Sequence, residues 1–353
     1  MKTIPILNVY YLLCYAWGRV QERDTRRLAK LGGLETIQDL LGKVLAGGVS
    51  HLFRRGIDRG YKERREDLAG IRGKLALSET AKRALRERGR AACDFEELTV
   101  DTPPNRILRT SLHGLLRRRV KLHDDVRSDV RSAYRRLDGV SRIRLTRKTF
   151  GQVQLGGNRR LYQFLLSVCR LLYESSAVDE KTGRTAFRDF RRDEATMWAL
   201  FEEFVTGFYE REQGVYDVNP GASRRIHWAE ATAEDDASKA RIPVMTADVI
   251  LESPERRIIL DTKYYQDALA RRRGTGTGKL HSGNLYQLLA YLRNRQATKA
   301  GGPVHEGILL YPEVDQPLRA DVRLEGFRIQ ARTVNLDRDW RHLHREMLET
   351  IGL

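Results

Sequence analysis

The sequence has 353 residues, a length that predicts two domains, and its 31% charged and 41% hydrophobic content is typical of a folded protein rather than a disordered one. The longest apolar run, Val9–Trp17, is too short to span a membrane and lacks the basic lead-in and cleavage site of a signal peptide. The three cysteines, Cys14, Cys93 and Cys169, are widely spaced and form neither a disulfide framework nor a paired metal site, which indicates a reducing, cytoplasmic compartment.

The formal net charge of +17 is distributed unevenly along the chain. Residues 1–160 hold 36 Lys and Arg against 18 Asp and Glu, whereas residues 161–353 hold 28 against 29. A basic excess confined to one half of a chain favours binding of that half to nucleic acid or to a partner that handles nucleic acid. An acidic protein partner, or a general preference of the composition for arginine, would explain the same excess.

The N-terminal half is predicted to be mainly helical. Apolar residues at helical spacing predict helices near residues 5–16, over 31–45 and within 104–137, and the glycines before residue 74 favour a short strand at 74–77. The arginines of the 104–137 segment lie on one face, which is either a solvated face or a binding surface. The sequence pattern changes at Gly156 and Gly157, which places the domain boundary near residue 155 and gives domains 1–155 and 156–353.

The C-terminal half mixes helices and strands. Helical periodicity covers residues 160–174, 194–211 and 285–292, and period-two or continuous apolar segments predict strands at 225–232, 244–251, 257–265, 307–311 and 327–334. This order predicts an α/β or α+β domain with a mixed central sheet. The N-terminal domain is expected to combine helices with small β elements.

Two acidic residues interrupt the apolar segments of neighbouring predicted strands. Asp248 lies in the first strand, Asp261 in the second, and Lys263 follows Asp261 on the same strand face. Buried carboxylates need a counter-charge, and two of them beside a lysine form a set that suits Mg²⁺ or another divalent metal. Such a set favours phosphodiester hydrolysis, in which the lysine orients a water or stabilises developing charge. A buried Asp–Lys salt bridge is the alternative.

The spacing of these three residues resembles the PD-(D/E)XK nuclease signature. Downstream, Gln287 and Tyr291 lie one turn apart on a predicted helix, which resembles the Q-x-x-x-Y helix of RecB-like nucleases, although ordinary helix packing explains it as well. Upstream, Glu202 is the candidate for a third metal ligand, and solvation of Glu202 and Glu203 is an equally good account.

Further segments, in order from residue 4 to about residue 340, resemble the McrC family, the nuclease subunits of McrBC modification-dependent restriction systems. The similar segments are Ile4–Gly18, Arg54–Gly56, Leu68–Gly73, Thr102–Ile107, Leu161–Phe164, Asp261–Tyr265, Arg272–Gly274, His281–Leu288 and Leu310–Pro312. The ordered set, rather than any single short motif, supports the resemblance.

The resemblance implies an N-terminal domain that docks to a hexameric McrB-like AAA+ GTPase and stimulates it, and a C-terminal PD-(D/E)XK endonuclease domain that cuts double-stranded methylated DNA. It carries Asp248, Asp261 and Lys263 over as nuclease residues, with Gln287 and Tyr291 in support. Gly274–Lys279 is rich in glycine but lacks the P-loop frame, so GTP is expected on the partner and not on this chain. A docking activator with a vestigial nuclease core is the competing interpretation.

Overall fold

The computed structural model describes residues 4–17, 34, 36–117, 120–153, 160–178, 185–187, 189–219, 224–229, 235–264, 278–298, 304–314 and 316–353. The chain forms two compact units. We call residues 34–187 the helical unit, and residues 1–33 together with 188–353 the sheet unit. The compact units therefore divide the chain differently from the predicted boundary near residue 155, which falls inside the helical unit. None of the described helices is long and apolar enough to cross a membrane.

The helical unit is built on one central helix. Its helices are α3 (Ile37–Arg55), α5 (Pro103–Leu115), α6 (Asp124–Arg136), α7 (Arg147–Gly151) and α8 (Arg160–Ser175). Helix α3 starts at Thr36, whose hydroxyl accepts a hydrogen bond from the Asp39 amide at 3.1 Å, and it packs against α5, α6 and α8. Helix α8 belongs to this core because the hydroxyl of Tyr162 donates to Asn105 Oδ1 on α5 at 2.7 Å.

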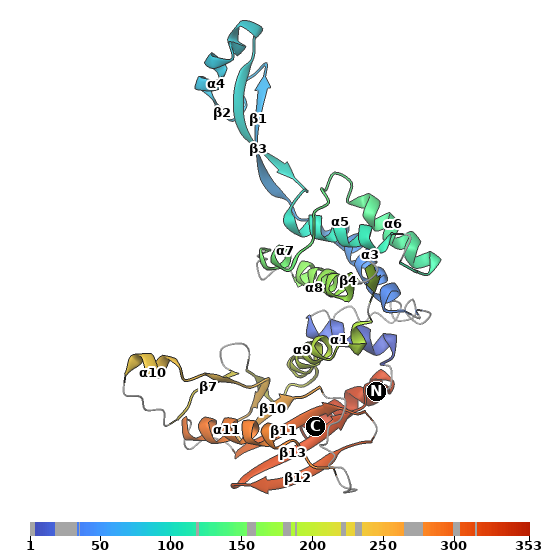
Figure 1. The fold of residues 1–353 in the computed structure, drawn as a ribbon, viewed down its shortest axis with the longest axis vertical. Coiled ribbons are helices and arrows are strands. Elements are labelled where there is room, and N and C mark those ends of the chain that lie inside the picture. Colours follow the sequence, from blue (N-terminus) through green and yellow to red (C-terminus); the bar gives the residue numbers. More distant parts are fainter. Residues whose placement is uncertain are drawn as a thin grey trace. The chain divides into compact units, whose positions relative to one another are not determined.

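A charged β-hairpin extends from the helical unit (Figure 1). It consists of β1 (Gly60–Leu68), β2 (Lys74–Leu75) and β3 (Ala91–Thr99) in the antiparallel order β1-β3-β2, with α4 (Leu77–Lys82) and the 3₁₀ turn η2 (Leu85–Arg88) between β2 and β3. Most side chains of β1 are exposed, so β1 shows no alternation of apolar and polar residues. Ion pairs across the strands, such as Arg65 with Asp94 at 2.5 Å, accompany the backbone ladder. A short ladder of β4 (Ser176–Val178) with β5 (Thr185–Phe187) closes the unit.

The sheet unit contains a six-stranded mixed sheet in the order β12-β13-β11-β10-β9-β6. The central strands β10, β11 and β13 run parallel, and β9 and β12 are antiparallel to their neighbours. The strands are β6 (Asp217–Val218), β9 (Val249–Glu252), β10 (Arg256–Thr262), β11 (Val304–Pro312), β12 (Arg319–Leu324) and β13 (Phe327–Val334). Strands β7 (Arg225–Ile226) and β8 (Met245–Thr246) form a separate pair.

Helices cover the sheet and fix its central strands. Helix α11 (Ser282–Thr298) packs on β10 and β11 through a cluster that includes Ile259, Leu288 and Leu309 (Figure 1). The side chain of Leu288 lies so close to the backbone of Gly307 that a Cβ there would meet it at 2.8 Å, so a larger residue on β11 would require Leu288 to shift. The remaining helices of the unit are α1 (Ile6–Ala16), α9 (Glu194–Glu212), α10 (Asp236–Ala240) and α12 (Trp340–Thr350), with the 3₁₀ turn η3 (Phe190–Arg192) before α9.

The first helix of the chain belongs to the sheet unit rather than to the basic half that follows it. Helix α1 packs along α9, and Asn8 Nδ2 donates to the carbonyl oxygens of Leu336 and Arg338, both at 2.7 Å. Tyr15 stacks against Trp340 of α12 with ring centroids 5.2 Å apart. The sheet unit is thus assembled from the two ends of the sequence.

Several predicted elements need correction. The segment 244–251 is not one strand, because the chain bends at Asp248 between β8 and β9. The strand predicted at 225–232 is limited to β7 among the described residues, and the strands β1, β3 and β12 were not predicted. Helices α1, α9 and α11 and strands β10, β11 and β13 confirm the predictions for their segments, apart from differences at the ends.

Candidate active site

The C-terminal end of β10 carries the residue pair on which the site is built. Side chains from Arg257 to Thr262 are all buried, because β10 lies between β9 and β11 and helices cover it. Asp261 is 1% and Lys263 7% exposed at the side chain, and Lys263 Nζ lies 2.6 Å from Asp261 Oδ2. The prediction that these two residues share a face is confirmed. The amide of Lys263 donates to the Leu310 carbonyl at 2.9 Å, which holds the chain beside β11 after the strand has ended.

Asp248 lies beside this pair because the neighbouring chain bends there. Its Oδ2 accepts hydrogen bonds from the amide of Thr262 at 2.6 Å and from the Thr262 hydroxyl at 2.7 Å. Its backbone carbonyl accepts a hydrogen bond from the guanidinium of Arg224. The break between β8 and β9 therefore places the first acidic residue next to the second, whereas the prediction had Asp248 inside one continuous strand.

The Asp261 carboxylate has too few partners for its burial. Apart from the ion pair with Lys263, neither of its oxygens has a hydrogen-bond partner among the described residues. Burial and the nearby charge of Asp248 raise the pKa of Asp261 to about 6, although Lys263 acts in the opposite direction. An ionised, buried carboxylate without enough donors is costly, so this position favours a further cation.

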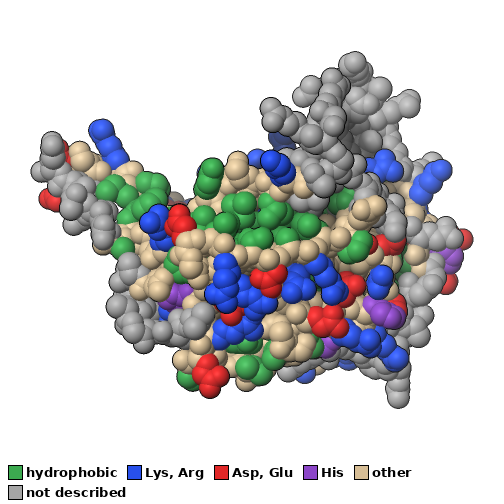
Figure 2. All heavy atoms as spheres, turned by 90° about the horizontal axis from the view of Figure 1, so that it is seen from below, with side chains coloured by type: hydrophobic (Ala, Val, Ile, Leu, Met, Phe, Trp, Pro, Cys, Tyr) green, Lys and Arg blue, Asp and Glu red, His purple; other side chains and the backbone are tan. Residues whose placement is uncertain are grey.

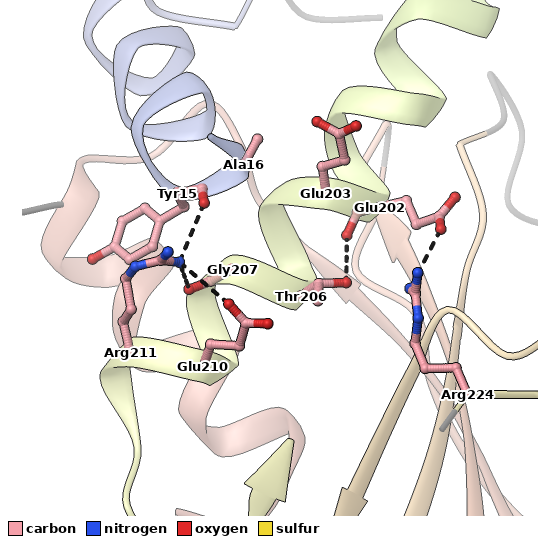
Figure 3. A pocket seen from close by; sticks show the side chains of 9 residues that line it. All are labelled: Tyr15, Ala16, Glu202, Glu203, Thr206, Gly207, Glu210, Arg211 and Arg224. Carbon is pink, nitrogen blue, oxygen red and sulfur yellow. Dashed lines mark hydrogen bonds and ion pairs between the residues drawn. The ribbon is translucent and has the colours of Figure 1, made fainter. Parts of the chain in front are cut away.

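Glu202 projects from α9 toward Arg224, at a distance of 3.8 Å between Oε1 and Nη1 (Figure 3). Burial raises its pKa to about 7, and the charge of Asp248 adds to this effect, while Arg224 opposes it. The charges at the β10 site thus act on the pKa of Glu202. However, no three His, Cys, Asp or Glu side chains of the described residues lie close enough together to hold a metal ion by themselves. A ligand role for Glu202 stays a prediction.

The predicted pair on α11 also lies at the site. Gln287 Nε2 donates to the Tyr291 hydroxyl at 2.6 Å, and this hydroxyl donates to the Thr246 carbonyl at 3.0 Å. Burial raises the pKa of Tyr291, and the charges of Asp261 and Asp248 raise it further. The structure therefore brings the side chains of β10, α9 and α11 to one region of the sheet unit.

Three residues at the site were missed by sequence reasoning. Thr262 binds Asp248, Arg224 lies between the Asp248 backbone and Glu202, and the ring of Trp198 has its centroid 5.9 Å from Lys263 Nζ. Trp198 is 47% exposed. A tryptophan on the polar side of an amphipathic helix could have drawn attention to it, whereas no sequence signal identifies Thr262 or Arg224.

A hollow of about 260 Å³ opens beside Glu202 (Figure 3). The end of α1 contributes Tyr15 and Ala16 to its lining, and α9 contributes most of the rest. Arg211 Nη1 donates to the Gly207 carbonyl at 2.7 Å, and a Cβ on Gly207 would lie only 2.1 Å from the Tyr15 carbonyl oxygen. Glycine at this position therefore permits α1 to pack closely on α9. Most of the glycine-rich segment Gly274–Lys279 lies outside the described residues.

Comparison with known proteins identifies the family. Residues 9–312 match the family described as McrBC 5-methylcytosine restriction system component. The chain is 36% identical over 346 residues to the type IV methyl-directed restriction enzyme EcoKMcrBC of Escherichia coli K12, covering 98% of this chain and 97% of that protein. It is similar in fold to a chain in the structure of Thermococcus gammatolerans McrB AAA+ hexamers with bound McrC, with a TM-score of 0.58, 18% identity, and coverage of 99% of this chain and 75% of the other. The chain belongs to the McrBC 5-methylcytosine restriction system component family.

Proposed function

We propose that this chain is the DNA endonuclease subunit of a McrBC-type restriction complex and that it hydrolyses phosphodiester bonds with a divalent metal. The observation that carries the proposal is the buried Asp261 carboxylate, which pairs with Lys263, neighbours Asp248 and lacks other partners among the described residues. A purely structural Asp–Lys pair would be expected to satisfy both carboxylate oxygens.

The donor set fits Mg²⁺. Asp248 and Asp261 supply carboxylate oxygens, and Mg²⁺ in nucleotide-processing sites is commonly held by one or two carboxylates together with waters and substrate phosphate. When bound, a divalent metal would polarise the scissile phosphate and lower the pKa of an attacking water.

The protein's own residues have separable roles in this proposal. Lys263, held by Asp261, is placed to orient the water or to stabilise negative charge on the phosphate. Thr262 fixes the Asp248 carboxylate through two hydrogen bonds, and Gln287 fixes the Tyr291 hydroxyl. The antiparallel β9–β10 pair, followed by α11 and the parallel strand β11, supports a PD-(D/E)XK type of domain.

The proposed partner is a hexameric AAA+ GTPase of the McrB type. The similar chain from Thermococcus gammatolerans is bound to McrB AAA+ hexamers. The family membership of this chain supports the same assembly and supports methylated double-stranded DNA as the substrate. GTP hydrolysis is assigned to the partner because the sequence has no P-loop frame.

The test is cleavage by the reconstituted complex with methylated DNA, GTP and Mg²⁺. Asp261→Asn and Lys263→Ala should each lower the cleavage rate by at least about a hundredfold, because each removes several kcal/mol of transition-state stabilisation. Partner GTPase stimulation should be unchanged. Asp321→Asn is the matched control, since Asp321 lies on the edge strand β12, pairs with Arg328 of β13 and should matter little for cleavage.

Two results would contradict the proposal. Normal cleavage by both site variants would remove these residues from the chemistry. Full GTPase stimulation by a wild-type chain that never cleaves DNA would instead favour the activator with a vestigial nuclease core.

A further inference from the structure

Helix α6 has one buried and one strongly basic face. Val126, Val130 and Ala133 are buried, and the helix packs on α3. The exposed side chains that line a hollow of about 440 Å³ on the other face are Ser128, Arg131, Ser132, Arg135 and Arg136. We call these five residues the α6 arginine face. Arg131 and Arg135 are one turn apart, so they are neighbours on the same face of the helix.

The charge of the α6 arginine face is not neutralised within the described part of the chain. Arg131, Arg135 and Arg136 form no ion pair there. The nearest acidic residues in sequence pair with other cations: Asp129 with Lys43 of α3 at 2.6 Å, and Asp138 with Arg109 of α5 at 3.2 Å. The other acidic residues of α6, Asp124 and Asp125, lie in its first turn, away from these arginines.

Several arginines of the sheet itself are paired, whereas Arg341 and Arg345 of α12, like the arginines of α6, form no ion pair among the described residues. Arg328 contacts both Asp321 and Glu306, and Arg256 also pairs with Glu306. On the face that Figure 2 presents, red Asp and Glu side chains lie among the blue side chains of Lys and Arg. The uncompensated positive charge on α6 is therefore a feature of that surface and not of every arginine in the chain.

Further cations adjoin the α6 arginine face. Tyr134 of α6 has its ring centroid 5.1 Å from the guanidinium carbon of Arg109 and 5.8 Å from the ring of His113. Arg142 Nη1 lies 2.7 Å from Nε2 of His113. Burial lowers the pKa of His113, and the charges of Arg142, Arg117 and Arg109 lower it further, which reports a positive potential beside α6.

The chemistry of the α6 arginine face suits phosphate better than a protein surface. None of the exposed large hydrophobic side chains of the described residues lies on α6, whereas protein interfaces normally bury aromatic or aliphatic anchors. The β-hairpin of the same unit does expose such anchors, including Tyr61, Ile71 and Leu98. Guanidinium groups bind phosphate oxygens in pairs, and serine hydroxyls are common additional phosphate donors.

We propose that the α6 arginine face binds the phosphate backbone of the DNA substrate. This inference rests on the proposed function, because DNA cleavage makes DNA the polyanion that the chain must hold. The helical unit, with 33 basic and 19 acidic side chains, would then supply electrostatic affinity that the sheet unit, with 31 basic and 28 acidic side chains, supplies much less of through net charge.

The experiment compares two double variants of the full chain that each remove two positive charges. Arg131→Gln/Arg135→Gln alters the α6 arginine face, and Arg341→Gln/Arg345→Gln alters an exposed pair with the same spacing on α12. Binding to a labelled duplex is measured in Ca²⁺ over a range of salt concentrations. The α6 variant should bind more weakly, and its slope of log K against log salt should be smaller by about 1.8, because each lost phosphate contact contributes about 0.9. The α12 variant should match the wild type.

Each alternative outcome has a distinct meaning. Equal losses in both variants would show a general charge effect and overturn the inference. Unchanged DNA binding with lost stimulation of the partner GTPase would assign the α6 arginine face to the protein partner and also overturn it. If the wild type cleaves DNA in the complex and the α6 variant binds the duplex as tightly as the wild type, only this inference fails. If the wild type neither binds the duplex nor cleaves DNA in the complex, the proposed function is contradicted as well.

Discussion

Lys263 only partly compensates the negative charge of the buried Asp261 carboxylate. Its folded-state pKa of about 6 lies above the ordinary value of 3.8, so the native state binds more protons than the unfolded state between these values. The free energy of unfolding therefore falls as pH rises through this range and stays lower above it. At neutral pH the unbound site is destabilising, and a divalent cation would relieve that cost.

A divalent cation should accordingly stabilise the wild-type chain. Ligand binding to the native state raises the free energy of unfolding by about 2.7 kcal/mol at a hundredfold excess over Kd. Thermal unfolding in Ca²⁺, Mg²⁺ or EDTA measures this shift at pH 7.5. The shift should be lost in Asp261→Asn and kept in the control Asp321→Asn. An equal shift in both variants would place the cation elsewhere.

Glu202 gives a separate prediction that depends on pH. Its folded-state pKa of about 7 exceeds the ordinary 4.5, so its contribution to stability is unfavourable above pH 7, shrinks through the interval between these values and vanishes below 4.5. Glu202→Gln imitates the protonated form. In EDTA, this variant should melt at a higher temperature than the wild type at pH 8 and at the same temperature near pH 4.5.

Glu203→Gln on the same helix is the control, because it removes the same charge one residue away and keeps a side-chain oxygen that can accept the hydrogen bond from Trp17 Nε1. A Glu202→Gln variant that is less stable than the wild type at pH 8 would show that the contact with Arg224 outweighs the burial and repulsion around the carboxylate.

The sequence predicted the residue pair at the site because strand periodicity fixes which residues share a face. One regular strand is enough to bring Asp261 and Lys263 together, and one regular helix is enough to bring Gln287 and Tyr291 together. Arg224 and Trp198 come from segments distant in sequence, and their positions depend on how α9 and β7 pack on the sheet. No local pattern encodes that packing.

At the scale of elements, the buried central strands of the six-stranded sheet were predictable and the charged strands β1 and β3 were not. Strand β10 contains an apolar run and β13 alternates apolar and polar residues, whereas β1 is rich in charged residues and exposes most of its side chains. The stability of β1 comes from its ladder with β3 and from cross-strand ion pairs such as Arg64 with Glu97. A single apolar run across Asp248 also concealed a bend, because β8 and β9 pair with different partners.

The packing of α8 on α3 can be tested with two adjacent glycines of α3. A Cβ on Gly48 would lie 2.2 Å from Cδ2 of the fully buried Leu165 of α8, whereas a Cβ on Gly47 meets nothing within 4 Å. Gly48→Ala should destabilise the helical unit by about 1–3 kcal/mol through overpacking. Gly47→Ala should stabilise it by about 0.4–1 kcal/mol, because alanine lowers the entropy of the unfolded chain.

Denaturant unfolding of the full chain measures the change in the free energy of unfolding for both variants. Hydrogen exchange of the α3 amides then assigns the change to the helical unit. Equal effects of the two substitutions would show that α8 does not pack on α3 at this position.

At the scale of the whole molecule, the sequence indicated two domains and a basic N-terminal part but did not locate the boundary. The glycines at 156 and 157 precede α8, yet α8 completes the core of the helical unit through contacts of Leu165 and Tyr162. Helix α1, in contrast, packs in the sheet unit. Local composition indicates where turns and linkers lie. It does not indicate which unit a helix packs in, because that depends on contacts between residues far apart in sequence.

The final prediction concerns fragments of the chain. Residues 34–187 should fold alone, since about 150 residues bury roughly 68–70% of their extended surface and the fragment keeps α8. Residues 1–155 should be unstable, because loss of α8 exposes the apolar sides of α3 and α5 and leaves Asn105 without its bond from Tyr162. Circular dichroism and thermal unfolding of both fragments measure the difference.

Residues 34–187 should also stimulate the GTPase of the partner ring, because they hold most of the basic excess and the β-hairpin that exposes Tyr61 and Leu98. The steady-state GTPase rate is compared with the full chain, with residues 34–187 and with a version of that fragment that carries Gly48→Ala. Stimulation by the folded fragment, reduced in proportion to unfolding in the variant, is the expected result. A stable fragment that leaves the GTPase rate unchanged would show that the sheet unit takes part in the contact with the ring, and stimulation would then require both units in one chain.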